Sequence, residues 1–139
     1  MNETALFALD PKLAADSLPV GRLGLSELRL VNDSRFPWLL LVPRQPGAAE
    51  IIDLAKPDRA VLFEEITAVS EALRAATGCD KLNVGALGNQ VRQLHVHVVA
   101  RFEGDAAWPG PVWGSGAAVA YETCAADRLI AAIRKRVPR

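Results

Sequence analysis

Residues 93–99 read Gln-Leu-His-Val-His-Val-Val, and this stretch decides how the chain folds and where its chemistry lies. It holds both histidines of the protein, His95 and His97. Successive side chains of a β-strand point to opposite faces of the sheet, so both imidazoles and the Gln93 amide are predicted to share one face. The apolar residues between them would face the other way and pack under helices. The stretch therefore predicts a strand that presents Gln93, His95 and His97 as a polar row.

The two imidazoles of this row indicate phosphoryl chemistry. Neutral imidazole is a nucleophile and a proton carrier near pH 7, and a phosphoryl group is the electrophile that histidine most often attacks in a site without metal. The spacing leaves two other interpretations open. The histidines could be polar residues on a solvated outer face, or they could chelate a metal, which needs a third and usually a fourth ligand. For those ligands the sequence offers only Cys79, Cys124 and carboxylates without ligand spacing.

Segments on both sides of this stretch predict further strands. Residues 38–42 form an unbroken apolar run between two prolines, which is typical of a strand covered on both faces and favours a central position in the sheet. The short connections between most strands favour antiparallel pairing. The predicted strands are residues 18–23, 27–31, 38–42, 81–87 and 93–101.

Two segments predict helices. From residue 57 to about residue 77 apolar side chains recur at intervals of three and four, and Gly78 stands where a C-terminal cap is expected. Residues 125–137 carry a second apolar stripe. We therefore expect an α+β fold, with an antiparallel sheet of about five strands, one long helix and a C-terminal helix. Residues 102–124 have no clear period, and a loop of this length is expected to be functional or part of an interface.

The composition fits one domain that spans residues 1–139. Sixteen Lys and Arg residues balance sixteen Asp and Glu residues, so charge gives no reason to expect nucleic acid or an anionic membrane as a partner. The N-terminus has an early acid and no basic region before an apolar stretch, and the longest apolar run, residues 37–43, is too short to cross a bilayer. We therefore expect a cytoplasmic protein without a disulfide framework.

Several motifs, in a fixed order, resemble the histidine triad family. Residues 93–99 match its signature, His-φ-His-φ-His-φ-φ with φ apolar, at every position except the first. Residues 81–85 and 88–91 resemble the segment that leads to the triad, with its Asn-x-Gly and Gly-Gln-x-Val features. Further similarity to the paired strands and to the start of the long helix lies in residues 30–33, 37–44 and 52–54. The resemblance thus runs through residues 28–101, and residues 102–139 would add the C-terminal loop and helix.

The resemblance implies a role for each matched residue. In the family the middle histidine, His95 here, attacks the α-phosphorus of a nucleotide, expels the leaving group and is released by water. The third, His97, holds phosphate oxygens and assists the charge that develops around the leaving group. The loop between the last two strands donates backbone amides to phosphate, for which Gly88 allows a close approach. Further contacts to phosphate or ribose are implied for Asn32, Asn83, Asn89 and Gln90.

Two positions depart from the family pattern. Gln93 replaces the first histidine of the triad, and Trp38 stands where many hydrolases of the family carry an additional histidine. Both changes remove a titratable group. We expect Gln93 to belong to the catalytic row as a neutral amide. Trp38 is either a core residue or one wall of a base pocket.

The leading hypothesis is an enzyme that hydrolyses or transfers a nucleoside monophosphate group through a covalent adduct on His95. The alternative is a nucleotide-binding protein with weak or no catalysis, because Gln93 leaves the triad incomplete. The resemblance implies no metal or prosthetic group. It also implies a homodimer whose small-molecule partner is a nucleoside phosphate.

Overall fold

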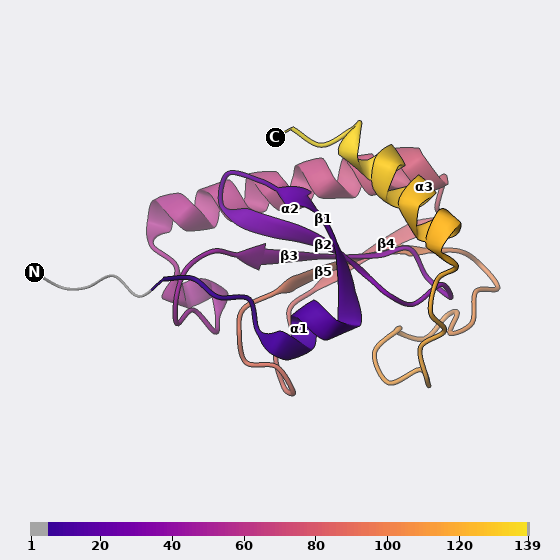
Figure 1. The fold of residues 1–139 in the computed structure, drawn as a ribbon, viewed down its shortest axis with the longest axis horizontal. Coiled ribbons are helices and arrows are strands. Elements are labelled where there is room, and N and C mark those ends of the chain that lie inside the picture. The colour runs from indigo at the N-terminus through magenta and orange to yellow at the C-terminus, as the bar shows by residue number, and fades with distance from the viewer. Residues whose placement is uncertain (1–5, 139) are drawn as a thin grey trace, which may run out of the picture.

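The computed structural model describes residues 6–138 of the chain, and its five strands and its helices follow one another as Figure 1 shows. The elements are α1 (Pro11–Asp16), β1 (Ser17–Arg22), β2 (Ser26–Val31), β3 (Trp38–Pro43), the short 3-10 helix η1 (Ile51–Asp53), α2 (Lys56–Thr77), β4 (Lys81–Gly85), β5 (Val96–Arg101) and α3 (Thr123–Arg134). The predicted α+β fold, with its five strands, long helix and C-terminal helix, is confirmed.

The strands form one antiparallel sheet in the order β1-β2-β3-β5-β4. The central strand is β3, as its unbroken apolar run predicted, and all its residues after Trp38 are buried. The register pairs His97 of β5 with Leu40 of β3 on one side and with Gly85 of β4 on the other. His97 therefore lies between the central strand and an edge strand.

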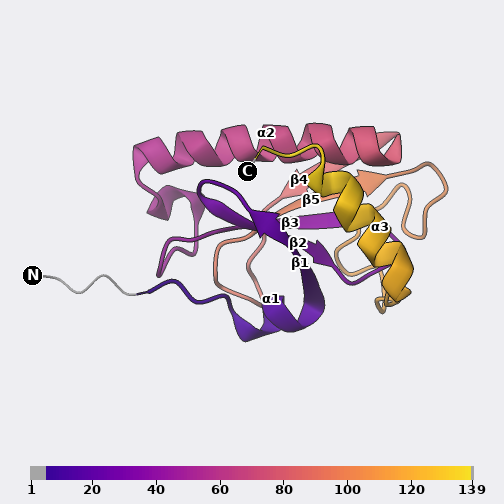
Figure 2. The same cartoon turned by 45° about the horizontal axis from the view of Figure 1, so that its top comes forward.

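Helices α2 and α3 lie on one face of the sheet and enclose the main core with it (Figures 1 and 2). Pro57 lies in the first turn of α2, and the helix ends at Gly78, whose φ of 66° is the left-handed conformation that glycine adopts without strain. Leu62 and Leu73 of α2 are fully buried in one cluster with Val98 of β5. None of the helices within residues 6–138 combines the length and the apolar character needed to cross a membrane.

The opposite face is covered by α1 and by the segment 102–122 that follows β5 (Figure 2). Leu13 of α1 packs against Leu40 of β3, and Val112 of the long segment packs against Val99 of β5. The sequence did not predict α1, because a helix of six residues is too short for a helical period to show.

Two ion pairs anchor the segment 102–122. Arg101, the last residue of β5, is 1% exposed and binds the Asp105 carboxylate with an Nε to Oδ2 distance of 2.8 Å. Hydrogen bonds from Arg101 hold the pKa of Asp105 well below its usual range. Farther along, Arg35 binds the buried Asp33 at 2.8 Å and also donates to the backbone oxygen of Ser115. The segment is therefore held by polar contacts as well as by packing.

The last strand is shorter than predicted. β5 begins at Val96, whereas the alternating pattern predicted a start at Gln93. Residues 93–95 therefore precede the ladder between β4 and β5. Leu94 nevertheless packs in the main core with Val96 and Val98, so the alternation of faces continues before the strand begins.

Candidate active site

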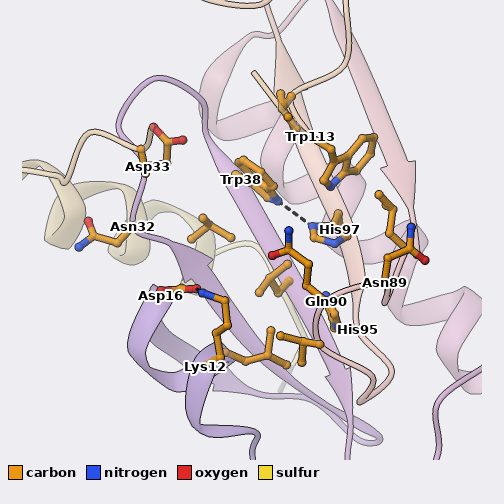
Figure 3. A pocket seen from close by; sticks show the side chains of 18 of the residues that line it. Lys12, Asp16, Asn32, Asp33, Trp38, Asn89, Gln90, His95, His97 and Trp113 are labelled. Atoms are coloured by element: carbon orange, nitrogen blue, oxygen red, sulfur yellow. Dashed lines mark hydrogen bonds and ion pairs between the residues drawn. The ribbon is translucent and has the colours of Figure 1, made fainter. Parts of the chain in front are cut away.

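A cavity of about 620 Å³ lies on the face of the sheet opposite α2. Its walls come from β3, β5, α1, the loop 87–91 and the segment 112–118. Figure 3 shows both histidines and Trp113 on one side of this cavity, and Asn32 and Asp33 on the other. Its volume falls within the range of about 300–1,000 Å³ that small-molecule sites occupy.

His95 lies at the cavity just before β5, and 6% of its surface is exposed. Its Nδ1 is 2.7 Å from the backbone carbonyl oxygen of Gln93. A carbonyl oxygen only accepts hydrogen bonds, so in the neutral ring Nδ1 carries the proton and donates it to this oxygen. The neutral imidazole of His95 therefore keeps its nucleophilic lone pair on Nε2.

His97 has the opposite tautomer. The indole N–H of Trp38 donates to Nδ1 of His97 over 2.9 Å (Figure 3). Because an indole nitrogen can only donate, Nδ1 must be unprotonated and the neutral ring carries its proton on Nε2. Burial, and after it the charge of His95, lowers the pKa of His97 to about 3. Near neutral pH, His97 therefore offers the cavity an uncharged N–H donor.

The two imidazoles complement each other. Their ring centroids are 4.9 Å apart. One ring contributes an acceptor nitrogen that can attack an electrophile, and the other contributes a donor that can stabilise a developing oxyanion. Such a pair can carry out group transfer to a histidine.

The loop 87–91 adds neutral donors beside the histidines. Gly88 has a φ of +77°, a conformation that favours glycine, and the side chains of Asn89 and Gln90 line the cavity. Within residues 6–138, the backbone amides of 88–91 donate to no other group of the protein. A loop of unpaired amides is suited to holding an anion.

The charged side chains of the cavity are already paired. Lys12 binds Asp16 at 2.9 Å, and Arg35 binds Asp33 at 2.8 Å. An anion beside the histidines would therefore be held mainly by neutral hydrogen-bond donors.

The family model for the HIT domain matches residues 12–104. The chain belongs to the histidine triad family. A histidine triad protein of Bradyrhizobium japonicum has 47% sequence identity and a TM-score of 0.95, with 96% of this chain and 100% of that chain covered. One from Sinorhizobium meliloti has 48% identity and a TM-score of 0.93, with 94% of this chain and 97% of that chain covered. One from Marinobacter aquaeolei has 41% identity and a TM-score of 0.93, with 96% and 97% covered.

More distant structures share the fold alone. A hypothetical histidine triad nucleotide-binding protein of Sulfolobus tokodaii has 18% identity and a TM-score of 0.67, with 90% of this chain and 86% of that chain covered. A zinc-bound histidine triad family protein of Mycobacterium smegmatis has 16% identity and a TM-score of 0.62, with 89% and 90% covered. No curated protein sequence matches the chain.

In this histidine triad protein the residue at the first triad position, Gln93, does not join the histidines in the cavity. Its Oε1 accepts a hydrogen bond from the backbone N–H of Asp10, and its Nε2 donates to the carbonyl oxygen of Ala8, both over 2.8 Å. Gln93 therefore faces the segment on the α1 side of the sheet, but its amide is occupied by main-chain partners near the N-terminus and does not line the cavity as expected. Through these bonds Gln93 holds the segment that leads into α1, one wall of the cavity.

The expected substrate contacts divide into two groups. Those that line the cavity are Asn32, Gly88, Asn89 and Gln90. Asn83 lies elsewhere, because its Oδ1 accepts a hydrogen bond from the guanidinium of Arg101 over 2.8 Å. Asn83 thus supports the anchor of the segment 102–122. Asn32 is itself held, since its Oδ1 accepts from the backbone N–H of Tyr121 over 2.9 Å.

Sequence reasoning missed one aromatic residue of the site. The rings of Trp113 and His97 meet edge to face, with centroids 5.3 Å apart. The long unpatterned segment was expected to be functional or part of an interface, but its two tryptophans could not be told apart by their neighbours in the sequence. Trp108 instead lies beside the Arg101 guanidinium, 5.7 Å from ring centroid to Cζ. Lys12 and Asp16 were missed as well, and no motif marks them.

Metal chelation by the two histidines finds little support in the described part of the chain. No cluster of three or more His, Cys, Asp or Glu side chains within residues 6–138 could hold a metal ion. Cys79 packs at the edge of the main core, and Cys124 is exposed on α3. Neither thiol is part of the cavity lining.

Proposed function

We propose that this protein binds a nucleoside phosphate derivative and transfers its nucleoside monophosphate group, through a covalent adduct on His95, to water or to another acceptor. The observation that carries the proposal is the pair of opposite tautomers, an Nε2 lone pair on His95 beside an Nε2–H on His97. The nucleotide-binding description of the Sulfolobus tokodaii protein, which shares the fold, agrees with this substrate class.

In the first step, Nε2 of His95 forms a bond to the α-phosphorus while the bond from phosphorus to the leaving group breaks. The leaving group departs with the bonding electrons and takes a proton from water. The Nδ1–H of His95 stays on the carbonyl oxygen of Gln93, which stabilises the positive charge that the ring acquires. His97 and the amides of 88–91 donate to the phosphate oxygens, whose charge grows in the transition state.

In the second step, an acceptor oxygen replaces the histidine. When the acceptor is water, an oxygen-phosphorus bond forms as the nitrogen-phosphorus bond breaks, and a proton is released to solvent. His95 recovers its lone pair, and the nucleoside monophosphate leaves. The same donors serve both steps, because the phosphate oxygens stay in place while the groups on either side of phosphorus change.

The nucleoside would extend away from the histidines toward α1. The cavity continues from His95 to Asn32 and to Lys12 and Asp16 of α1. Asn32 offers polar atoms for ribose hydroxyls, whereas Leu13 and Leu40 supply an apolar surface against which a base can pack.

The direct test is the mass of the intact protein after incubation with an adenosine phosphoramidate or a dinucleoside polyphosphate. We expect a gain equal to one nucleoside monophosphate, which disappears in His95→Ala and persists in the matched control Trp108→Phe outside the cavity. A gain that persists in His95→Ala would overturn the proposal. So would a metal ion held at these histidines at full occupancy, measured by elemental analysis of the purified protein.

The alternative is a nucleotide-binding protein without turnover. Glutamine at position 93 favours it, because a neutral amide supplies no titratable group for proton transfer and this amide is bonded to the main chain. Calorimetry with a nucleoside monophosphate distinguishes the two: binding without any adduct or product from the activated substrates would establish the alternative.

The homodimer implied by the family resemblance is also a proposal for this chain. β4 is an edge strand, and Val84 on it is 49% exposed. An exposed apolar edge suits pairing with a second copy. Light scattering should then give twice the chain mass, and Val84→Lys should give the monomer; a monomeric wild type would exclude the dimer. Cytoplasmic localisation stays a prediction from the sequence.

A further inference from the structure

His97 is enclosed by two tryptophans from distant parts of the chain (Figure 3). Trp38 begins β3, and Trp113 lies in the segment after β5. Their ring centroids are 5.7 Å and 5.3 Å from that of His97. The enclosure leaves 8% of the His97 surface exposed, so little water can solvate a charge on its ring.

The other neighbours of His97 give no compensating negative charge. Its partners across the sheet are Leu40 of β3 and Gly85 of β4, and neither can ionise. Within the described residues, the titratable group that influences it is His95, which would repel a second positive charge. A charged His97 would thus be both poorly solvated and unpaired.

The carboxylates of the cavity do not supply the missing negative charge to His97. Asp33 is held by Arg35, and Asp16 is held by Lys12. In Figure 3 both carboxylates lie across the cavity from His97. No carboxylate within residues 6–138 forms a hydrogen bond or ion pair with His97.

The direction of the Trp38 indole is fixed by the fold. Trp38 pairs with Val99 in the ladder between β3 and β5, and its ring meets that of Phe36 edge to face with centroids 6.3 Å apart. These contacts all lie within the protein, and they direct the indole N–H at Nδ1 of His97.

From this geometry we infer that Trp38 is a positioning residue that holds His97 as the neutral Nε2–H tautomer, so that His97 serves a bound phosphate as a constant hydrogen-bond donor. The first part rests on the contacts alone, and the second part rests on the proposed function. Tryptophan is suited to this role because its N–H cannot accept a hydrogen bond. A histidine at this position, as in many hydrolases that the motif resembles, could reverse the direction of the bond and release the other tautomer.

The inference limits how the site responds to pH. With His97 fixed, its ring should add no ionisation to the pH dependence of adduct formation. Loss of the Trp38 N–H should add one in acid, because Nδ1 can then take a proton without displacing a donor.

Trp113, the other tryptophan beside His97, provides a matched control for the loss of the Trp38 N–H. Its indole nitrogen is buried without a hydrogen-bond partner among the described residues, so it does not set the tautomer. A Cβ at Gly85 would come within 3.3 Å of the Trp113 ring, which shows how closely this ring fits against β4. Trp113→Phe keeps an aromatic ring in this position and leaves the Trp38 hydrogen bond in place.

The test is NMR of protein labelled with 15N in histidine and tryptophan, followed from about pH 8 to about pH 5. In the wild type we expect Nδ1 of His97 to show the shift of an unprotonated nitrogen throughout, with Nε2 protonated. A coupling through the hydrogen bond should join the indole nitrogen of Trp38 to this Nδ1. In Trp38→Phe both tautomers should appear, and the midpoint of the His97 titration should rise by about one pH unit or more. Trp113→Phe should keep the wild-type tautomer.

A wild-type His97 that carries its proton on Nδ1, or that becomes charged above about pH 6, would overturn the inference. So would a folded Trp38→Phe whose His97 signals match those of the wild type. If this variant does not fold, the coupling in the wild type decides, and its absence counts against the inference. These measurements need no substrate, so a failure of adduct formation would remove the proposed function while leaving the tautomer result intact.

Discussion

The two faces of the sheet are built in different ways. The face under α2 and α3 is closed by apolar side chains at regular strand and helix intervals, with Leu62 and Leu73 fully buried. The cavity face is covered by short segments that polar contacts hold in place. The Gln93 amide holds the N-terminal segment, and the Arg101 guanidinium holds the segment after β5. We therefore expect the first face to contribute most of the stability and the second to carry the proposed function. Substitutions should therefore separate the two properties.

We expect His95→Ala to separate the effect on function from the effect on stability most strongly. Removal of the nucleophile should lower adduct formation by on the order of 10⁴-fold or more. The side chain borders an open cavity, so the melting temperature should stay within a few degrees of the wild type. Intact mass in single-turnover reactions and a thermal melt measure the two effects. Activity retained by this variant would place the nucleophile elsewhere.

We expect the opposite for Leu73→Ala on the helix-covered face, where stability should fall and function should stay unchanged. Loss of a fully buried leucine should cost about 3–4 kcal/mol in the free energy of unfolding, measured with urea. The affinity of the folded protein for a nucleoside monophosphate should not change, because α2 lies across the sheet from the cavity. Ile133→Val, also fully buried, should cost about 1 kcal/mol and serves as a graded control. A large loss of affinity in either variant would mean that the two faces are coupled.

Asp105→Asn tests whether polar anchors also contribute to stability on the cavity face. It leaves the buried guanidinium of Arg101 without its charged partner and should cost about 2–3 kcal/mol at pH 7. Because hydrogen bonds from Arg101 lower the pKa of Asp105 in the folded state, this contribution is complete above the unfolded-state pKa of about 4 and is lost as the pH falls below it. The difference between wild type and variant should therefore shrink in acid. A constant difference would show that the charge of Asp105 is not the cause.

Of these substitutions, we expect Gln93→Glu to have the smallest effect, a modest loss of nucleotide affinity. The carboxylate can still accept from the N–H of Asp10, but it cannot donate to the carbonyl oxygen of Ala8. Loss of one hydrogen bond should weaken nucleotide binding about threefold to tenfold by loosening the wall that α1 forms. Amide exchange at Asp10 should speed up while exchange in α2 does not. Unchanged exchange and affinity would mean that this contact does not support the cavity.

The sequence predicted the regular part of the molecule well, because the signals there are local. The apolar run of β3 marked the central strand, and Gly78 marked the end of α2. Helix α1 was missed, since its six residues carry no visible period. The alternation of side chains placed both histidines at the cavity, but no local pattern showed that the main chain of residues 8 and 10 would occupy the Gln93 amide.

The candidate site was predictable in its residue types but not in its contacts. The motif pointed to His95 and His97, and both line the cavity. The tautomer of His97, however, depends on Trp38, which stands 59 positions earlier in the chain. The partner of Asn83 is likewise remote, 18 positions away at Arg101. Such pairings arise from the tertiary fold, so no local pattern records them.

The two hydrogen bonds of the Gln93 amide to the N-terminal segment both go to main-chain atoms, those of Ala8 and Asp10. The amide therefore cannot distinguish which side chains residues 8 and 10 carry, provided that residue 10 keeps its N–H. Proline at position 10 would break the contact, whereas other residues would leave it intact. The rest of the segment is constrained by its side chains, because the Asp10 carboxylate caps α1 and Phe7 and Leu9 pack beside Leu13.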